Sequence, residues 1–185
     1  MGKIVSYFFI SLDGVVEAPD RWHFPYFNDE MGDAVGEGMA KCAAFLMGRT
    51  MYDEWSKHWP AVPEDSEDAE IAAFFNNIPK YVISDSLTEA TWSNSTIISG
   101  DVKAKVQQLK DETDGNINMS GSTTTVRWLL ANGLLDELDL LVHPIAVGRG
   151  QRLFDDDAPT TPLKLLWSKT FSTGVPHLTY GTDVD

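Results

Sequence analysis

The sequence has few cysteines and few basic residues. Cys42 is the only cysteine in 185 residues, which excludes a disulfide framework and a zinc site built on cysteines. Fourteen lysines and arginines stand against 28 aspartates and glutamates, so the formal net charge is −14. A chain this acidic lacks the basic face that nucleic-acid binders and binders of anionic membranes need. It can still bind a small anion through a local arginine and backbone N–H groups.

Long apolar runs are also absent. The apolar run at the beginning of the chain is too short for a signal peptide, and no segment approaches the length of a membrane span. Apolar residues make up 43% of the chain and charged residues 23%, which is the ordinary balance of a globular protein. The length predicts one domain over residues 1–185, and we expect the protein to be cytoplasmic.

Strand patterns alternate with helical patterns along most of the chain. Helices are predicted from residue 28 or 29 to about 42, from 49 through 55, after Asp101, and from 122 or 123 to 132, while residues 58–68 are expected to form a solvated loop. Strands are predicted over residues 4–10, 43–47, 80–84, 95–99, 116–119 and 138–147, with a closing hairpin of residues 163–171 and 175–180. This order predicts an α/β fold whose sheet is mostly parallel and ends in an antiparallel pair.

Two strand-to-helix junctions combine glycine with hydroxyl side chains. They are Leu46-Met47-Gly48-Arg49-Thr50 and Met119-Ser120-Gly121-Ser122-Thr123-Thr124. Glycine lets a ligand approach the backbone, and a helix start offers free N–H groups and a positive dipole end. Ordinary helix capping explains each junction equally well. Two of them in one parallel sheet favour a binding site, because α/β sheets bind ligands beyond the carboxyl ends of their strands.

Signatures of independent catalysis are absent. The four histidines show no metal-ligand spacing, and the sequence contains no Walker, His-Glu-x-x-His or Gly-x-Ser-x-Gly motif. Cys42 has no obvious histidine partner, and His143 lies in an apolar run, as core histidines do. Two anion-binding junctions without a nucleophile or a metal site predict chemistry borrowed from a nucleotide cofactor.

These motifs together resemble the dihydrofolate-reductase-like family, and within it the reductase domain of bacterial riboflavin biosynthesis and its stand-alone relatives. The most specific piece is the Gly-x-Gly-x-x-Leu-Phe of residues 148–154, whose glycines are expected to form a bulge or tight turn. The other matching segments are residues 11–15, 46–52, 80–84, 120–122 and 136–138. The resemblance implies a three-layer fold with NADPH across the carboxyl ends of the strands. It also implies a homodimer, paired through residues 138–147 and the last hairpin.

The family's cofactor contacts are carried over by position. Gly48 and Arg49 would face the phosphates on the adenosine side, with a hydroxyl from Thr50, and Ser84 would meet the region of the 2′-phosphate. The pyrophosphate would lie at the helix start formed by Gly121, Ser122 and Thr123.

The loop of Asp13 and Gly14 would cover the nicotinamide, and Asp13 would orient that loop or relay a proton. The sequence departs from the family at Asp85, since a carboxylate next to Ser84 tends to repel a 2′-phosphate. No metal is expected.

The resemblance implies an NADPH-dependent reductase of a pyrimidine or pterin-like heterocycle, similar to 5-amino-6-(5-phosphoribosylamino)uracil reductase. The zinc deaminase half of the bifunctional riboflavin enzyme is missing, because its signature requires several cysteines. Glu30, Asp33 and Glu37 lie on the helix that would carry a folate-binding carboxylate, although they fit a solvated helix face equally well. Two alternatives therefore stay open: a nucleotide-binding module without turnover, and a binder of folates or antifolates.

Overall fold

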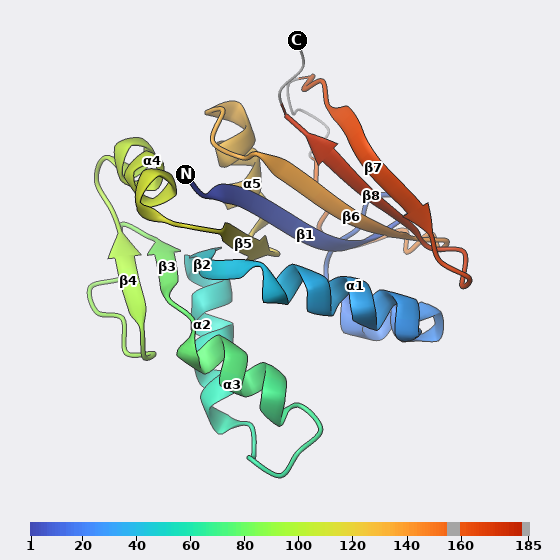
Figure 1. The fold of residues 1–185 in the computed structure, drawn as a ribbon, viewed down its shortest axis with the longest axis horizontal. Helices are drawn as coiled ribbons and strands as arrows, with labels where there is room; N and C mark the ends of the chain where they lie inside the picture. Colours follow the sequence, from blue (N-terminus) through green and yellow to red (C-terminus); the bar gives the residue numbers. More distant parts are fainter. Residues whose placement is uncertain (155–159, 183–185) are drawn as a thin grey trace.

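A computed structural model describes residues 1–154 and 160–182 of the chain (Figure 1). Its eight strands form one sheet in the order β4-β3-β2-β5-β1-β6-β8-β7. Strands β1 to β6 run parallel to one another, whereas β8 is antiparallel to both β6 and β7. The strands are β1 (Lys3–Ser11), β2 (Cys42–Gly48), β3 (Lys80–Ile83), β4 (Ser95–Ile98), β5 (Asn116–Ser120), β6 (Glu137–His143), β7 (Lys164–Thr170) and β8 (Pro176–Gly181). The predicted α/β class, the mostly parallel sheet and the closing hairpin are confirmed.

Five α-helices of the described chain cover the two faces of this sheet (Figure 1). Side chains of successive strand residues point to opposite faces, so each apolar strand supplies two cores. Ala44 and Leu46 of β2 belong to the core beneath α4 and α5, while Phe45 and Met47 belong to the core beneath α2 and α3. The helices are α1 (Asp29–Ala40), α2 (Arg49–His58), α3 (Ala69–Asn77), α4 (Val102–Glu112) and α5 (Thr123–Ala131). The result is the expected three-layer arrangement.

Two helix starts follow the capping rules, and one helix was not predicted. The Asn28 side chain accepts a hydrogen bond from the Met31 N–H at 3.1 Å, and that of Asp101 accepts one from the Ala104 N–H at 3.1 Å. The predicted loop over residues 58–68 contains a short 3₁₀ turn, Trp59–Ala61, whose tryptophan packs against Phe75. Helix α3 follows this loop directly.

The strand predicted over residues 138–147 was wrong at its carboxyl end. It ends at His143, and Pro144, which has no N–H to donate to a sheet, follows. The Ile145 N–H then donates to the His143 carbonyl at 2.7 Å, which turns the chain out of the sheet. Gly148 and Gly150 both have positive φ values, 81° and 115°, as the predicted tight turn requires.

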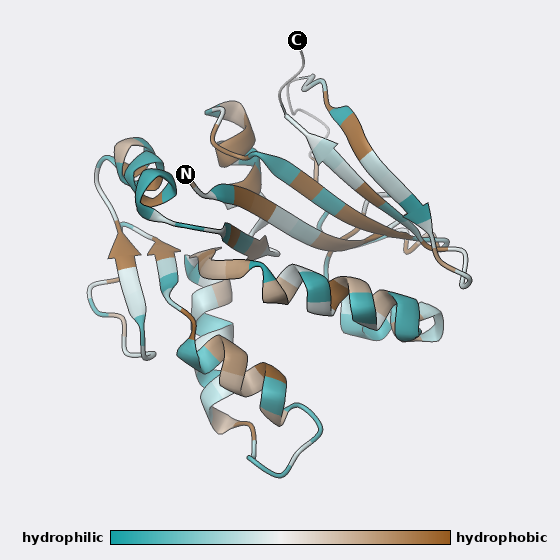
Figure 2. Cartoon of the chain, viewed as in Figure 1, coloured by the Kyte–Doolittle hydropathy of each residue, from teal (hydrophilic) through white to brown (hydrophobic). Residues whose placement is uncertain are grey.

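Strand β7 forms one edge of the sheet and is exposed along its whole length. Leu165, Leu166 and Trp167 are 51%, 51% and 48% exposed. Figure 2 shows a brown, apolar band on this edge strand. Within the described residues, the helices are too short or too polar to cross a membrane.

Candidate functional site

A cleft of about 830 Å³ lies at the carboxyl ends of β2 and β5. Because these strands are parallel neighbours, the two glycine-containing junctions leave the sheet at the same edge. Six of the eight site residues predicted from the sequence line this cleft, namely Gly48, Arg49, Thr50, Gly121, Ser122 and Thr123. Its volume lies within the range of about 300–1,000 Å³ that is usual for ligand sites.

A direct hydrogen bond joins the two junctions. The Ser122 hydroxyl accepts from the Gly48 N–H at 3.0 Å. Ser122 stands at the N-cap position of α5 in the left-handed region, at φ 52°, and its side chain does not cap the helix. The Ser122 side chain therefore joins the two neighbouring junctions instead of capping the helix. The first N–H groups of α5 have no partners within the helix and remain available to a ligand.

Two glycines keep the cleft wall free of side chains. A Cβ added at Gly48 would stand 2.8 Å from the Thr125 hydroxyl oxygen. One added at Gly121, where φ is +62°, would stand 2.5 Å from the terminal methyl of Met51. Behind this bare backbone, the Thr123 hydroxyl is buried and has no hydrogen-bond partner among the described residues. An unpaired buried hydroxyl is costly, so it marks a position where a ligand acceptor or donor would be stabilised.

The charges of the cleft are unevenly distributed. Arg49 is the one basic side chain among the described residues that line it, against the acids Glu17, Asp20 and Glu54. The Arg49 Nε atom forms an ion pair with Asp53 Oδ2 at 2.7 Å. A guanidinium carries two further NH₂ groups beyond Nε. An anionic ligand in this cleft would depend on Arg49 and on the amino-terminal ends of α2 and α5.

Ser84 lies outside the cleft. It is buried after β3, where its hydroxyl accepts from the N–H groups of Ser86 at 3.2 Å and Leu87 at 3.0 Å. The neighbouring Asp85 carboxylate accepts from the Gly100 N–H at 3.2 Å. These contacts stabilise the turn after β3. The structure does not bring Ser84 into the cleft with the other residues predicted to bind the cofactor.

Asp13 also lies outside the cleft, in a network that joins two loops. Its carboxylate accepts from the Ser11 hydroxyl at 2.6 Å, the Val147 N–H at 3.0 Å and the Gly148 N–H at 2.7 Å. The bond from Ser11, and then the two backbone bonds, lower the pKa of Asp13 from 3.8 to about 2. Such a carboxylate holds no proton at neutral pH. This favours the loop-orienting role of Asp13 over the proton relay, since residues 16–20 of the same loop line the cleft.

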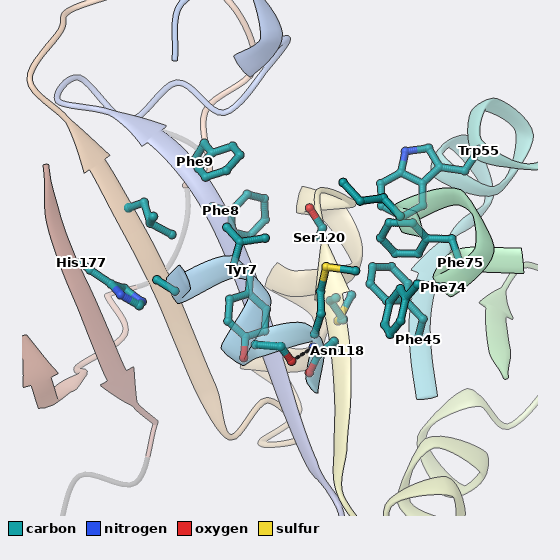
Figure 3. Close-up of a pocket in the computed structure, with 17 residues that line it drawn as sticks. Tyr7, Phe8, Phe9, Phe45, Trp55, Phe74, Phe75, Asn118, Ser120 and His177 are labelled. Carbon is teal, nitrogen blue, oxygen red and sulfur yellow. Dashed lines mark hydrogen bonds between the residues drawn. The ribbon is translucent and has the colours of Figure 1, made fainter. Parts of the chain in front are cut away.

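A second cavity, of about 200 Å³, adjoins the cleft (Figure 3). This cavity was not predictable from the sequence, because its wall combines strands with three helices that lie far apart along the chain. Tyr7 and Phe9, two residues apart on β1, point to the same face of the sheet, and Phe74 and Phe75 of α3 form another part of the wall. Both cavities are lined by Phe8, Phe9, Trp55 and Ser120, so each opens beside the other.

A buried pair of polar side chains borders this second cavity. His177 of β8 bonds through Nε2 to the carboxylate of Asp139 on the neighbouring strand β6. The Thr179 hydroxyl donates to the second carboxylate oxygen at 3.2 Å. Burial, followed by the negative charge of Asp139, raises the pKa of the Tyr7 phenol, so the tyrosine stays neutral at the cavity wall. The spacing of Asp139 and His177 in the sequence gives no signal for this pair.

The helix carboxylates considered for folate binding do not line this cavity. Asp33 and Glu37 are exposed. Glu30 accepts from both the N–H and the hydroxyl of Ser172, each at 2.7 Å, which fastens α1 to the hairpin turn. No group of three or more potential metal ligands occurs in residues 1–154 and 160–182.

Residues 2–176 match the protein family described as the RibD C-terminal domain. The chain belongs to this family. Among curated proteins, it is 25% identical to the uncharacterized protein YyaP of Bacillus subtilis over 179 residues, which covers 96% of this chain and 94% of YyaP.

Solved structures agree with this family and confirm the dihydrofolate-reductase-like fold. A putative riboflavin biosynthesis protein from Shewanella superposes with a TM-score of 0.76 at 18% identity, covering 98% of this chain and 99% of the other. Dihydrofolate reductase from Enterococcus faecalis, in complex with NADP(H), gives a TM-score of 0.65 at 11% identity and covers 99% and 98% of the two chains. A deaminase/5-amino-6-(5-phosphoribosylamino)uracil reductase from Thermotoga maritima gives 0.67 at 15% identity, with 98% of this chain and 57% of that one covered.

Proposed function

We propose that this protein is an NADPH-dependent reductase of a small pyrimidine or pterin-like heterocycle. The observation that carries the proposal is the contact between the two cavities. A cleft with two helix amino termini at its wall opens at Phe9 and Trp55 beside a separate apolar cavity. A reductase needs this arrangement, because its cofactor and its substrate must meet face to face.

The residues of the cleft fit a dinucleotide. The N–H groups at the start of α5 and the unpaired Thr123 hydroxyl would hold the pyrophosphate, and Gly48 and Arg49 would meet a phosphate at the start of α2. NADPH, when bound, would supply the hydride. The residues shared by both cavities would border the reacting rings and exclude water from them.

The comparisons support a function like that of the reductase half of riboflavin-type enzymes. The chain corresponds to 57% of the bifunctional Thermotoga protein and belongs to the family of the RibD C-terminal domain. The dihydrofolate reductase of similar fold is in complex with NADP(H), which supports the same class of cofactor here.

Calorimetric titration with NADPH, paired with a Thr123→Val variant, tests the proposal. Valine keeps the shape of threonine and removes the hydroxyl, so the affinity for NADPH should fall about 2- to 13-fold, the equivalent of one hydrogen bond. Thr96→Val is the matched control, because Thr96 is exposed on β4 away from the cleft. Failure of the wild-type protein to bind NADPH would overturn the proposal.

Turnover distinguishes the reductase from its alternatives. Oxidation of NADPH in the presence of a pyrimidine or pterin substrate supports the reductase. Binding of NADPH without oxidation, over a panel of such heterocycles, would instead identify a nucleotide-binding module. Tight binding of an antifolate without oxidation would identify a folate-type binder.

A further inference from the structure

Two histidine rings are buried where the loop of residues 16–27 packs on the sheet. His23 and His143 are 7% and 0% exposed, and their ring centroids are 6.0 Å apart. His143 ends β6, whereas His23 belongs to the loop. Residues 16–20 of the same loop line the cleft. The two rings therefore join the sheet to a segment that shapes the ligand site.

The His23 ring also packs on an aromatic side chain of the site. It stacks on Phe9, with the ring centroids 4.6 Å apart and the planes inclined by 11°. Phe9 lines both the cleft and the second cavity (Figure 3). Trp22, the residue before His23, packs edge-on against His143 at 5.2 Å, and its indole N–H donates to the Glu17 carbonyl at 3.1 Å. The position of Phe9 and the path of the loop therefore depend on the same cluster.

Each ring has a nitrogen that is left without a partner. His23 Nδ1 and His143 Nε2 are buried and make no hydrogen bond among the described residues. The other nitrogen of His143, Nδ1, lies 2.9 Å from the Leu141 carbonyl. A neutral imidazole carries a proton on one nitrogen, whereas an imidazolium carries a proton on both. Protonation of either ring would therefore bury a charge with an unpaired donor, which is costly.

The groups around the two rings do not offset this cost. Burial, followed by the positive charge of His143, lowers the pKa of His23, while the carboxylate of Asp20 raises it. Asp20 is exposed, so salt screens its effect. Burial also lowers the pKa of His143, against the opposing effect of the Leu141 and Ile10 carbonyls. Within the described chain, Asp20 is the one carboxylate that acts on either ring. The other ring neighbours are the aromatic side chains of Phe9, Trp22, Phe24, Tyr26 and Phe27.

We propose that neutral His23 is a positioning residue that keeps Phe9 and the loop of residues 16–27 in place, and that protonation of His23 releases the loop in mild acid. Release moves the ring into water, where the pKa of a histidine is 6.5. Because the closed loop favours the neutral ring, it is fully stable above pH 6.5 and becomes less stable as the pH falls below this value. The inference adds regulation by pH to the cleft, and its consequence for cofactor binding rests on the proposed function.

Hydrogen exchange followed by mass spectrometry tests the release without any ligand. The protection factor of a peptide over residues 16–27 reports the equilibrium between the closed and the open loop. A histidine that has a pKa of 6.5 in the open loop and stays neutral in the closed one lowers this factor by up to about 30-fold between pH 7.5 and pH 5.0. A peptide over β5, in the middle of the sheet, should keep its protection. An unchanged protection factor of the loop would overturn the proposal, as would a parallel loss in β5, which would mean global unfolding.

Two matched phenylalanine variants identify the sensor. His23→Phe keeps an aromatic ring on Phe9 and removes no hydrogen bond of the described residues. His58→Phe replaces an exposed histidine at the end of α2. The loop should lose most of its pH response in His23→Phe and keep it in full in His58→Phe. Equal responses of the two variants would contradict the assignment to His23. The comparison of the loop with β5 in the wild type requires no substitution, so that arm stands even where a variant fails to fold.

Titration with NADPH at the same two pH values separates this inference from the proposed function. The affinity should fall in acid by a further factor of up to about 30 in the wild type compared with His23→Phe, because the variant keeps the loop closed. Equal decreases in the two proteins would overturn the link between the loop and the cleft. A wild type that binds no NADPH at either pH would overturn the proposed function, while a loop that still opens in acid would support the release of His23.

Discussion

Arg49 is the residue whose substitution tests the cofactor cleft most sharply. Its ion pair with Asp53 joins side chains that are 39% and 42% exposed, four residues apart on α2. Exposed pairs of this spacing stabilise a helix by about 0.3–0.5 kcal/mol. Arg49→Ala should therefore change the free energy of unfolding by about 0.5 kcal/mol or less.

The expected effect on cofactor binding is much larger. A charge-assisted hydrogen bond between a guanidinium and a phosphate contributes about 1.5–3 kcal/mol. Its loss in Arg49→Ala corresponds to about 10- to 150-fold weaker binding of NADPH. If the contact is made to the 2′-phosphate, the affinity for NADH stays unchanged. If it is made to the pyrophosphate, both affinities fall alike.

Asp53→Ala is the matched control for this substitution. It breaks the same ion pair and leaves the guanidinium in the cleft. Titration calorimetry at fixed ionic strength should show full affinity for Asp53→Ala and reduced affinity for Arg49→Ala. Identical affinities of the wild type and both variants would mean that Arg49 only stabilises the first turns of α2. The proposed contact between Arg49 and a cofactor phosphate would then be refuted.

Three further predictions concern the fold and the assembly. The buried Lys80 ammonium donates to the carbonyls of Phe75 at 2.7 Å and Ile78 at 2.8 Å. Lys80→Met would leave these carbonyls unpaired, so it should lower the free energy of unfolding, measured in urea, by about 1–3 kcal/mol. A decrease below 0.5 kcal/mol, taken roughly as the scatter of surface substitutions, would count against this. Because the pKa of Asp13 is lowered from 3.8 in the unfolded chain to about 2 in the folded protein, its carboxylate stabilises the fold fully above pH 3.8, and this stabilisation is lost as the pH falls towards about 2. The free energy of unfolding of Asp13→Asn should therefore lack this decrease at acidic pH. An acid-unfolding profile identical to that of the wild type would refute the prediction. We also propose a homodimer that covers the exposed edge strand β7. Light scattering at micromolar concentration should then give twice the 20.5 kDa mass of the chain. A 20.5 kDa species alone would exclude the dimer.

The cleft was predictable because its signals are local in the sequence. Gly48 ends β2 and Gly121 directly follows β5, each shortly before a helix, and parallel neighbours place such junctions at one sheet edge. The hairpin was predictable for the same reason, since two adjacent strand patterns flank a short turn. The partners of Asp13 were not predictable, because Val147 and Gly148 follow more than 130 residues later in the chain.

The second cavity was beyond sequence reasoning. Phe9, Trp55, Phe74 and His177 come from four elements and meet only through tertiary packing. Helix α3 escaped prediction because it is nine residues long and follows an acidic, proline-containing loop. When α3 is not predicted, one wall of the cavity is missing. The remaining apolar residues of the cavity then look, in the sequence, like scattered core positions.

A crystal structure of the protein grown with an excess of NADP⁺ tests the central claim most directly. The account predicts electron density for the pyrophosphate at the amino-terminal ends of α2 and α5, with the nicotinamide beside Phe9 and Trp55 at the mouth of the apolar cavity. A dinucleotide bound on another face of the sheet, or a cleft that stays empty at a concentration of about 1 mM, the upper end of the usual KM range, would contradict it.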